Sequence, residues 1–97
     1  MIKLFISQPM ATKTDEEIFK EREEAIEFVK REIDSEVELV DSYINEDLTP
    51  LQFLGRSISI MATADYVYFA PGWRKARGCL IEHECAVQYG LPHYDSK

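Results

Sequence analysis

Short apolar segments alternate with longer amphipathic segments along the whole chain. The apolar runs Lys3–Ile6, Glu36–Val40 and Tyr66–Ala70 have the length of strands and are rich in β-branched, aromatic or leucine side chains. Apolar residues recur at helical spacing over residues 15–33, 50–63 and 75–89. Strands that alternate with helices pair in parallel and carry helices on both faces. The pattern therefore predicts an α/β domain with the order β-α-β-α-β-α, followed by a short last segment that can add a fourth strand.

Capping signals predict where two of these helices begin. Thr14 is followed three residues later by Glu17, the arrangement of a capping box. Thr49 precedes a proline at the first helical position, and Gln52 stands three residues after the cap. We therefore expect helices to start directly after Thr14 and Thr49.

Length and charge limit the classes of function. A chain of 97 residues has material for one core, so we expect a single domain over residues 1–97 and a modest stability that a partner subunit would improve. Eighteen acidic and eleven basic residues give a net charge of -7, which opposes binding to a nucleic acid polymer.

No apolar run is long enough to span a bilayer and no signal peptide is evident. We expect a cytoplasmic protein without membrane contacts.

The cysteines and histidines indicate neither a disulfide nor a metal site. Cys79 and Cys85 are six residues apart, and no second cysteine pair or paired histidines stand at ligand spacing. We interpret both cysteines as buried thiols. No metal and no cofactor is expected.

The carboxyl ends of parallel strands are where ligands bind in open α/β sheets. Here these ends are followed by the segments 7–10, 41–47 and 71–78. The third segment is unusual because Arg74, Lys75 and Arg77 stand at the start of a predicted helix, where the helix dipole disfavours cations. A phosphate or carboxylate of a ligand would compensate for this, and so would ion pairs with the many carboxylates of residues 15–47.

One carboxylate of the last predicted helix has only small neighbours on its face. Gly78 and Ala86 lie four residues before and after Glu82, which leaves space beside the carboxylate. In such a pocket Glu82 can act as a nucleophile toward C1 of a sugar; the alternative is an ordinary helix residue. His83 is interpreted as a half-exposed histidine without a catalytic role.

Two further residues each have a functional and a structural interpretation. Asp65 stands where a helix ends and a buried strand begins, so it is either a second carboxylate of the site or an acceptor for backbone N–H groups at this junction. Trp73 follows Pro71-Gly72 at the end of a strand, where an indole either stacks on a base or packs in the core.

The sequence resembles the nucleoside 2-deoxyribosyltransferases and the related deoxynucleoside-monophosphate N-glycosidases, most closely their short uncharacterised relatives in bacteria and phages. The most specific match is the glutamate Glu82 with a glycine four residues before it and an alanine four residues after it. The carrying segments are residues 3–10, 55–65, 76–86 and 89–90.

This resemblance implies a three-layer, flavodoxin-like (Rossmann-like) sandwich with a four-stranded parallel sheet. It implies that Glu82 attacks C1′ of a (deoxy)ribosyl group, that Asp65 or water handles the proton, and that the active molecule is a homodimer or larger homo-oligomer. The segment 7–10 would line the sugar or base, and Arg74 and Arg77 would hold a 5′-phosphate. The residues expected to contact this nucleoside or nucleotide are Phe5, Ser7, Gln8, Pro9, Met10, Ser57, Gly72, Trp73, Arg74, Arg77 and Gly78.

The sequence departs from the enzymes at two acidic positions. Ser57 stands where they carry an aspartate that assists the leaving base, and Ala76 stands where the transferase has another acid. A serine cannot act as that acid at neutral pH. Two functions therefore remain open: an N-glycosidase or deoxyribosyltransferase with Glu82 as nucleophile, and a protein that binds a nucleotide without cleaving it.

Overall fold

The computed structural model describes residues 1–42, 44 and 46–97. Four strands alternate with three α-helices, and a short 3-10 helix precedes the last of them. The strands are β1 (Ile2–Ser7), β2 (Val37–Leu39), β3 (Tyr66–Phe69) and β4 (His93–Asp95). The helices are α1 (Asp15–Ile33), α2 (Pro50–Met61), η1 (Trp73–Lys75) and α3 (Arg77–Gln88). The predicted α/β alternation is confirmed.

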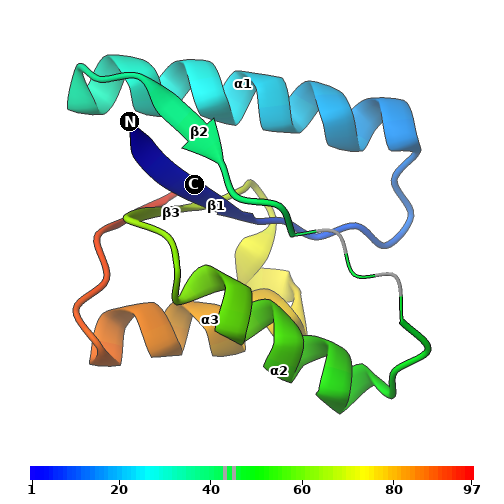
Figure 1. The fold of residues 1–97 in the computed structure, drawn as a ribbon. Helices are drawn as coiled ribbons and strands as arrows, with labels where there is room; N and C mark the ends of the chain where they lie inside the picture. Colours follow the sequence, from blue (N-terminus) through cyan, green and yellow to red (C-terminus); the bar gives the residue numbers. More distant parts are fainter. Residues whose placement is uncertain (43, 45) are drawn as a thin grey trace.

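All strand pairs are parallel, and the strand order is β2-β1-β3-β4. Helix α1 covers one face of the sheet, and α2 and α3 cover the other, so the molecule has three layers (Figure 1). This is a small Rossmann-like α/β fold with the strand order of flavodoxin-like sheets. The chain leaves β1 toward α1 on one face and β3 toward α3 on the other, and ligands of open α/β sheets bind beyond the carboxyl ends of such adjacent strands.

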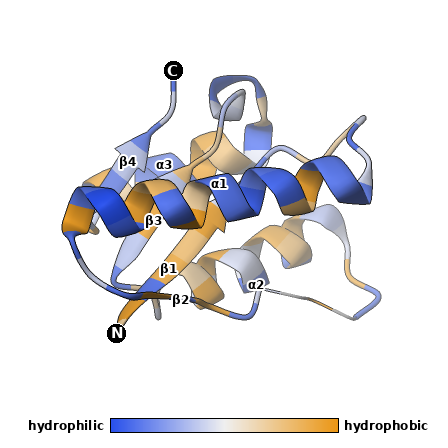
Figure 2. Ribbon diagram, turned by 90° about the horizontal axis from the view of Figure 1, so that it is seen from above, coloured by the Kyte–Doolittle hydropathy of each residue, from blue (hydrophilic) through white to orange (hydrophobic). Residues whose placement is uncertain are grey.

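The side chains of β1 and β3 alternate between two separate apolar clusters. Leu4 and Ile6 pack under α1, whereas Phe5 packs with Val67 and Phe69 on the side of α2 and α3. This follows from the two-residue period of a strand. Figure 2 shows the apolar central strands beneath α1, whose outer surface is mostly hydrophilic.

Both predicted capping boxes are present. The Thr14 hydroxyl accepts from the Glu17 backbone N–H and the Glu17 side chain accepts from the Thr14 backbone. Thr49 and Gln52 make the same pair of contacts at the start of α2. These caps set the beginnings of the two helices.

The structure corrects the predicted start of the last helix. The expected helix from residue 75 is divided: η1 ends at Lys75, Ala76 is extended with φ of -107°, and α3 begins at Arg77.

The expected loop over residues 41–47 has no helix or strand at its described positions, and residues 43 and 45 lie outside the described residues. Among the described helices, none has the length and apolarity needed to cross a bilayer.

Candidate functional site

A pocket of about 270 Å³ opens at the carboxyl end of β1, between the first turn of α3 and the amino-terminal half of α2. Its volume is near the lower end of the range for small-molecule sites, about 300–1,000 Å³. Its described lining residues come from five segments of the chain. They are Phe5, Ile6, Ser7, Gln8, Pro9, Met10, Arg22, Ser42, Ile44, Pro50, Phe53, Leu54, Ser57, Ala76, Arg77, Gly78, Cys79 and Glu82.

Glu82 is the only carboxylate among these described lining residues, and it is buried at 6% exposure. The Ser7 hydroxyl donates to Glu82 Oε1 at 2.7 Å, and the Ser57 hydroxyl donates to Oε2 at 2.6 Å. Short O–H···O⁻ contacts of this kind are charge-assisted hydrogen bonds. One serine therefore holds each oxygen, and the plane of the carboxylate is fixed.

Burial and hydrogen bonding act on Glu82 in opposite directions. Burial raises the pKa of the carboxyl above its ordinary value, while the hydrogen bonds from Ser57 and Ser7 oppose that rise. A carboxylate with little water around it is a stronger nucleophile than a solvated one, provided that it remains ionised. The two serines support the ionised form.

The neighbouring thiol has a different character. Burial raises the pKa of the Cys79 thiol; the Ser7 hydroxyl opposes this effect and the charge of Glu82 adds to it. Cys79 is also part of the apolar cluster beneath α2 and α3. A neutral, buried thiol is a poor nucleophile, so Cys79 contributes to the pocket as part of its wall.

Ser7 reaches Glu82 because of its position in β1. It follows Phe5 by two residues, so both side chains lie on the face covered by α3. Ser7 is the last residue of the strand and is fully buried, with Phe69 as its partner in the sheet register. A small polar residue at this position can therefore contact a helix residue that is distant in the sequence.

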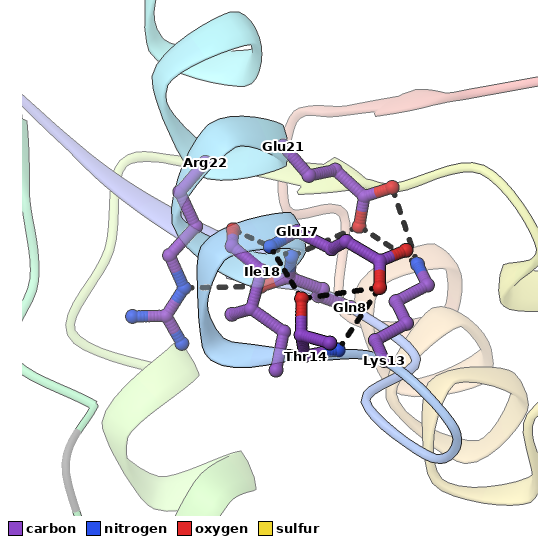
Figure 3. Close-up of polar contacts among 7 residues, drawn as sticks. All are labelled: Gln8, Lys13, Thr14, Glu17, Ile18, Glu21 and Arg22. Carbon is purple, nitrogen blue, oxygen red and sulfur yellow. Dashed lines mark hydrogen bonds and ion pairs between the residues drawn. The ribbon is translucent and has the colours of Figure 1, made fainter.

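The amide of Gln8 is bound to α1 and does not donate into the pocket. Its Nε2 donates to the Ile18 carbonyl at 3.1 Å and to Glu21 Oε1 at 2.9 Å, while its Oε1 accepts from Arg22 Nε at 3.0 Å (Figure 3). Lys13 pairs with the same Glu21 carboxylate at 3.1 Å. Gln8 thus fixes the guanidinium of Arg22, whose terminal nitrogens point away from Lys13 and Glu21 in Figure 3.

A second guanidinium lines the pocket at the start of α3. Arg77 is the first residue of the helix, and no ion pair or hydrogen bond of its side chain is found with the described residues. Ala76 supplies no side-chain cap, so the first-turn N–H groups beside Arg77 lack a side-chain acceptor. Together with Arg22 this gives the pocket two cations and an uncapped helix start, which favour an anion.

The chain matches a known sequence family over almost its whole length. The model of the family described as "Domain of unknown function (DUF4406)" matches residues 2–94. The chain belongs to this family. No curated protein matches it.

The pocket of this DUF4406 domain contains most of the residues that the sequence suggested as ligand contacts. The structure brings together Phe5, Ser7, Gln8, Pro9, Met10, Ser57, Arg77 and Gly78 around Glu82. Of these, Ser7 and Ser57 bind the carboxylate directly. The others form the walls and the mouth of the pocket.

The segment after β3 does not contribute the expected contacts. Gly72 adopts a left-handed conformation with φ of 88°, and the chain turns back beneath the sheet. Trp73 is consequently buried at 5% exposure, with its Nε1 donating to the Ser96 carbonyl at 3.0 Å. Arg74 donates to the same carbonyl at 2.9 Å and lies 4.4 Å above the Trp73 ring. Gly72, Trp73 and Arg74 therefore do not line the pocket.

Asp65 lies at the amino end of the central strands, whereas the pocket of Glu82 lies at the carboxyl end of β1. Its Oδ2 accepts from the Lys3 backbone N–H at 2.9 Å, and its own N–H donates to the Lys3 carbonyl at 2.8 Å. It directly precedes β3, whereas the pocket lies beyond the carboxyl end of β1. Asp65 joins two strands, and the structure does not bring it into one site with Glu82.

Several lining residues of the DUF4406 domain were not indicated by the sequence. Arg22 is one of many charged residues on α1. What distinguishes it is its contact with Gln8, the residue after β1, which accepts a hydrogen bond from Arg22 Nε. Ser42, Ile44 and Ala76 lie in the expected ligand segments 41–47 and 71–78 but were not named individually, and the others come from β1 and the first turns of α2 and α3. The missed residues are Ile6, Arg22, Ser42, Ile44, Pro50, Phe53, Leu54, Ala76 and Cys79.

Proposed function

We propose that this DUF4406 domain is an N-glycosidase or deoxyribosyltransferase that acts on nucleosides or nucleoside 5′-monophosphates, with Glu82 as nucleophile. The observation that carries the proposal is the buried Glu82 carboxylate, which is held by one serine hydroxyl on each oxygen at the bottom of a pocket. Its placement among small side chains leaves room for a sugar C1′. The resemblance of its surroundings to the deoxyribosyltransferases agrees with this chemistry.

In the proposed reaction, Glu82 attacks C1′ and a C–O bond forms while the C1′–N bond breaks. The base leaves with the bonding electron pair and takes a proton from water. A water molecule, or a second base, then attacks C1′ of the glycosyl ester, and the ester C–O bond breaks to restore the Glu82 carboxylate. Two displacements at C1′ give net retention of configuration.

The cationic side of the pocket supports a phosphorylated substrate. Arg22 and Arg77 both line the pocket, and α3 begins beside them without a side-chain cap. Guanidinium groups and a helix start together bind phosphate oxygens well. We therefore favour nucleoside 5′-monophosphates over unphosphorylated nucleosides.

One observation favours a second function, the binding of a nucleotide without cleavage. Glycosidic chemistry commonly uses two carboxylates, and Glu82 is alone among the described lining residues. Ser57 occupies the position of the missing acid and donates to Glu82. A protein with this site could bind a nucleotide as a sensor or sequestering protein.

Turnover assays distinguish the two functions. The protein is incubated with a panel of nucleosides and nucleoside 5′-monophosphates, released base is measured by chromatography, and binding is measured by calorimetry. The enzyme proposal predicts release that Glu82→Gln abolishes and that the exposed, matched variant Glu84→Gln preserves. Saturable binding without release would establish the second function instead. Trp73 fluorescence is unsuitable as a probe because this side chain is buried outside the pocket.

The expected homo-oligomer is supported by exposed apolar side chains on α2 and α3. Leu51 is 78% exposed, and Leu80 and Val87 are 45% and 48% exposed. A second copy of the chain would cover such residues and add apolar burial that a small domain lacks. Sedimentation velocity tests this, since Leu80→Glu should lower the mass of the main species.

A further inference from the structure

Two histidines and an aspartate meet outside the pocket, where α3 packs against β4. His83 Nε2 is 3.0 Å from Asp95 Oδ2, and His93 Nε2 is 3.7 Å from Asp95 Oδ1. One ligand atom from each of the three residues lies within 4.8 Å of the other two. Tetrahedral zinc with bonds of about 2.0–2.1 Å places its ligand atoms roughly 3.3 Å apart, so the side chains would rotate toward one another by up to roughly 1.5 Å to bind it.

The protonation state of His93 leaves a lone pair directed at this cluster. His93 Nδ1 is 2.8 Å from the Leu91 carbonyl, and a carbonyl only accepts, so Nδ1 carries the proton. In the neutral ring, Nε2 is then an acceptor. A backbone carbonyl that fixes the second ring nitrogen in this way is typical of histidines that ligate metals.

A second acceptor faces that lone pair. Asp95 Oδ1 is buried and has no hydrogen-bond partner in the part of the chain that the structure describes. A buried carboxylate oxygen without a hydrogen-bond partner is costly, and His93 Nε2 lies 3.7 Å from this one. These two acceptor atoms are 3.7 Å apart, an arrangement that a bound metal ion would make favourable.

Aromatic packing holds both imidazoles in place. The His83 ring is stacked on Trp73 at 4.2 Å, and Phe69 contacts His83 and His93 edge-on at 4.9 and 5.8 Å. The side chains of the two histidines nevertheless keep 20% and 23% of their surface exposed. The cluster is thus rigid on its inner side and open to solvent on its outer side.

We propose that His83, His93 and Asp95 form a binding site for a divalent transition-metal cation of the zinc class. The two Nε2 atoms and one Asp95 oxygen supply three ligands, and water would complete the coordination sphere. For His83 Nε2 to bind the ion, the proton that lies between it and Asp95 moves to Nδ1 of the same ring or to solvent. The bound ion would tie the short edge strand β4 to α3 and stabilise the folded chain.

Zinc titration of chelator-treated, tag-free protein tests the proposal. Calorimetry is expected to show one Zn²⁺ per chain, and Zn²⁺ is expected to raise the melting temperature. His93→Gln should weaken binding by at least about 10-fold, the lower end of the loss that even outer-shell substitutions cause. One matched control is Glu84→Gln, on the same helix as His83. The other is Cys85→Ser, which removes a half-buried thiol that would compete for zinc. Both should bind zinc as the wild type does.

Nitrogen NMR of the unmodified chain keeps the test independent of any folding defect in a variant. Added Zn²⁺ should shift the Nε2 resonances of His83 and His93 together, with saturation at one equivalent. Absence of saturable zinc binding would overturn the proposal. Binding that Cys85→Ser abolishes and His93→Gln retains would also overturn it.

Discussion

The Ser7 hydroxyl donates to Glu82 Oε1 at 2.7 Å and so joins the last residue of β1 to the middle of α3. The contact crosses from the sheet to a helix that is seventy-five residues away in the chain. Because Ser57 binds the other oxygen, three elements orient one carboxylate. Preorganisation of this kind is what a nucleophile in a glycosyl-transfer site needs.

Removal of the Ser57 hydroxyl should raise the pKa of Glu82 further. The hydrogen bond from Ser57 favours the ionised carboxylate and so lowers the pKa of Glu82. In Ser57→Ala, less therefore opposes the rise in this pKa that burial causes. The loss of a hydrogen bond to a charged group should also lower the free energy of unfolding at neutral pH by about 1.5–3 kcal/mol. Carbon NMR of the Glu82 carboxyl measures the first effect and urea unfolding the second. Ser59→Ala, an exposed position on the same helix, is the control and should change neither.

Glu82→Gln should stabilise the folded protein at neutral pH. The folded-state pKa of Glu82 is raised above its unfolded value, so the folded chain binds more protons in the interval between the two pKa values. The free energy of unfolding of the wild type therefore falls as the pH rises through that interval, which begins at the ordinary carboxyl pKa of 4.5. The glutamine has no charge to ionise, and we expect a gain of about 0.5–2 kcal/mol at pH 7. Urea unfolding at several pH values checks this. A gain that stays constant down to pH 4 would contradict the assignment.

Arg77→Ala should weaken binding of a nucleoside 5′-monophosphate and leave the binding of the corresponding nucleoside unchanged. Loss of a charge-assisted bond to phosphate costs about 1.5–3 kcal/mol, or roughly tenfold or more in affinity. Calorimetry in a Glu82→Gln background prevents consumption of the ligand. Arg74→Ala serves as the comparison, because Arg74 binds the Ser96 carbonyl outside the pocket. Equal losses for both ligands would place the phosphate elsewhere.

The fold could be predicted because its determinants are local. Apolar runs of strand length, helical spacing and the boxes at Thr14 and Thr49 each depend on residues close together in the chain, and all of them recur in the structure. Glu82 could be selected for a similar reason, since Gly78 and Ala86 are its neighbours on one helix. These patterns also place Ser7 at the end of a strand, where a ligand site is expected.

The remaining site residues depend on contacts between distant segments. The left-handed turn at Gly72 directs Trp73 into the core, and composition alone does not distinguish this turn from a ligand loop. The histidine cluster was missed for the same reason: His83 meets His93 and Asp95 only because β4 returns beside β3. Sequence spacing between two histidines indicates a metal site only when both lie on one local element.

The stereochemistry at C1′ is the most direct test of Glu82 as a nucleophile. The protein is incubated in methanol-containing buffer with the substrate that the panel identifies, and the methyl glycoside formed first is examined by proton NMR. Attack by Glu82 followed by attack of methanol predicts the retained β configuration at C1′. An inverted α-methyl glycoside would mean that solvent attacks the substrate directly and would contradict the role of Glu82 as nucleophile.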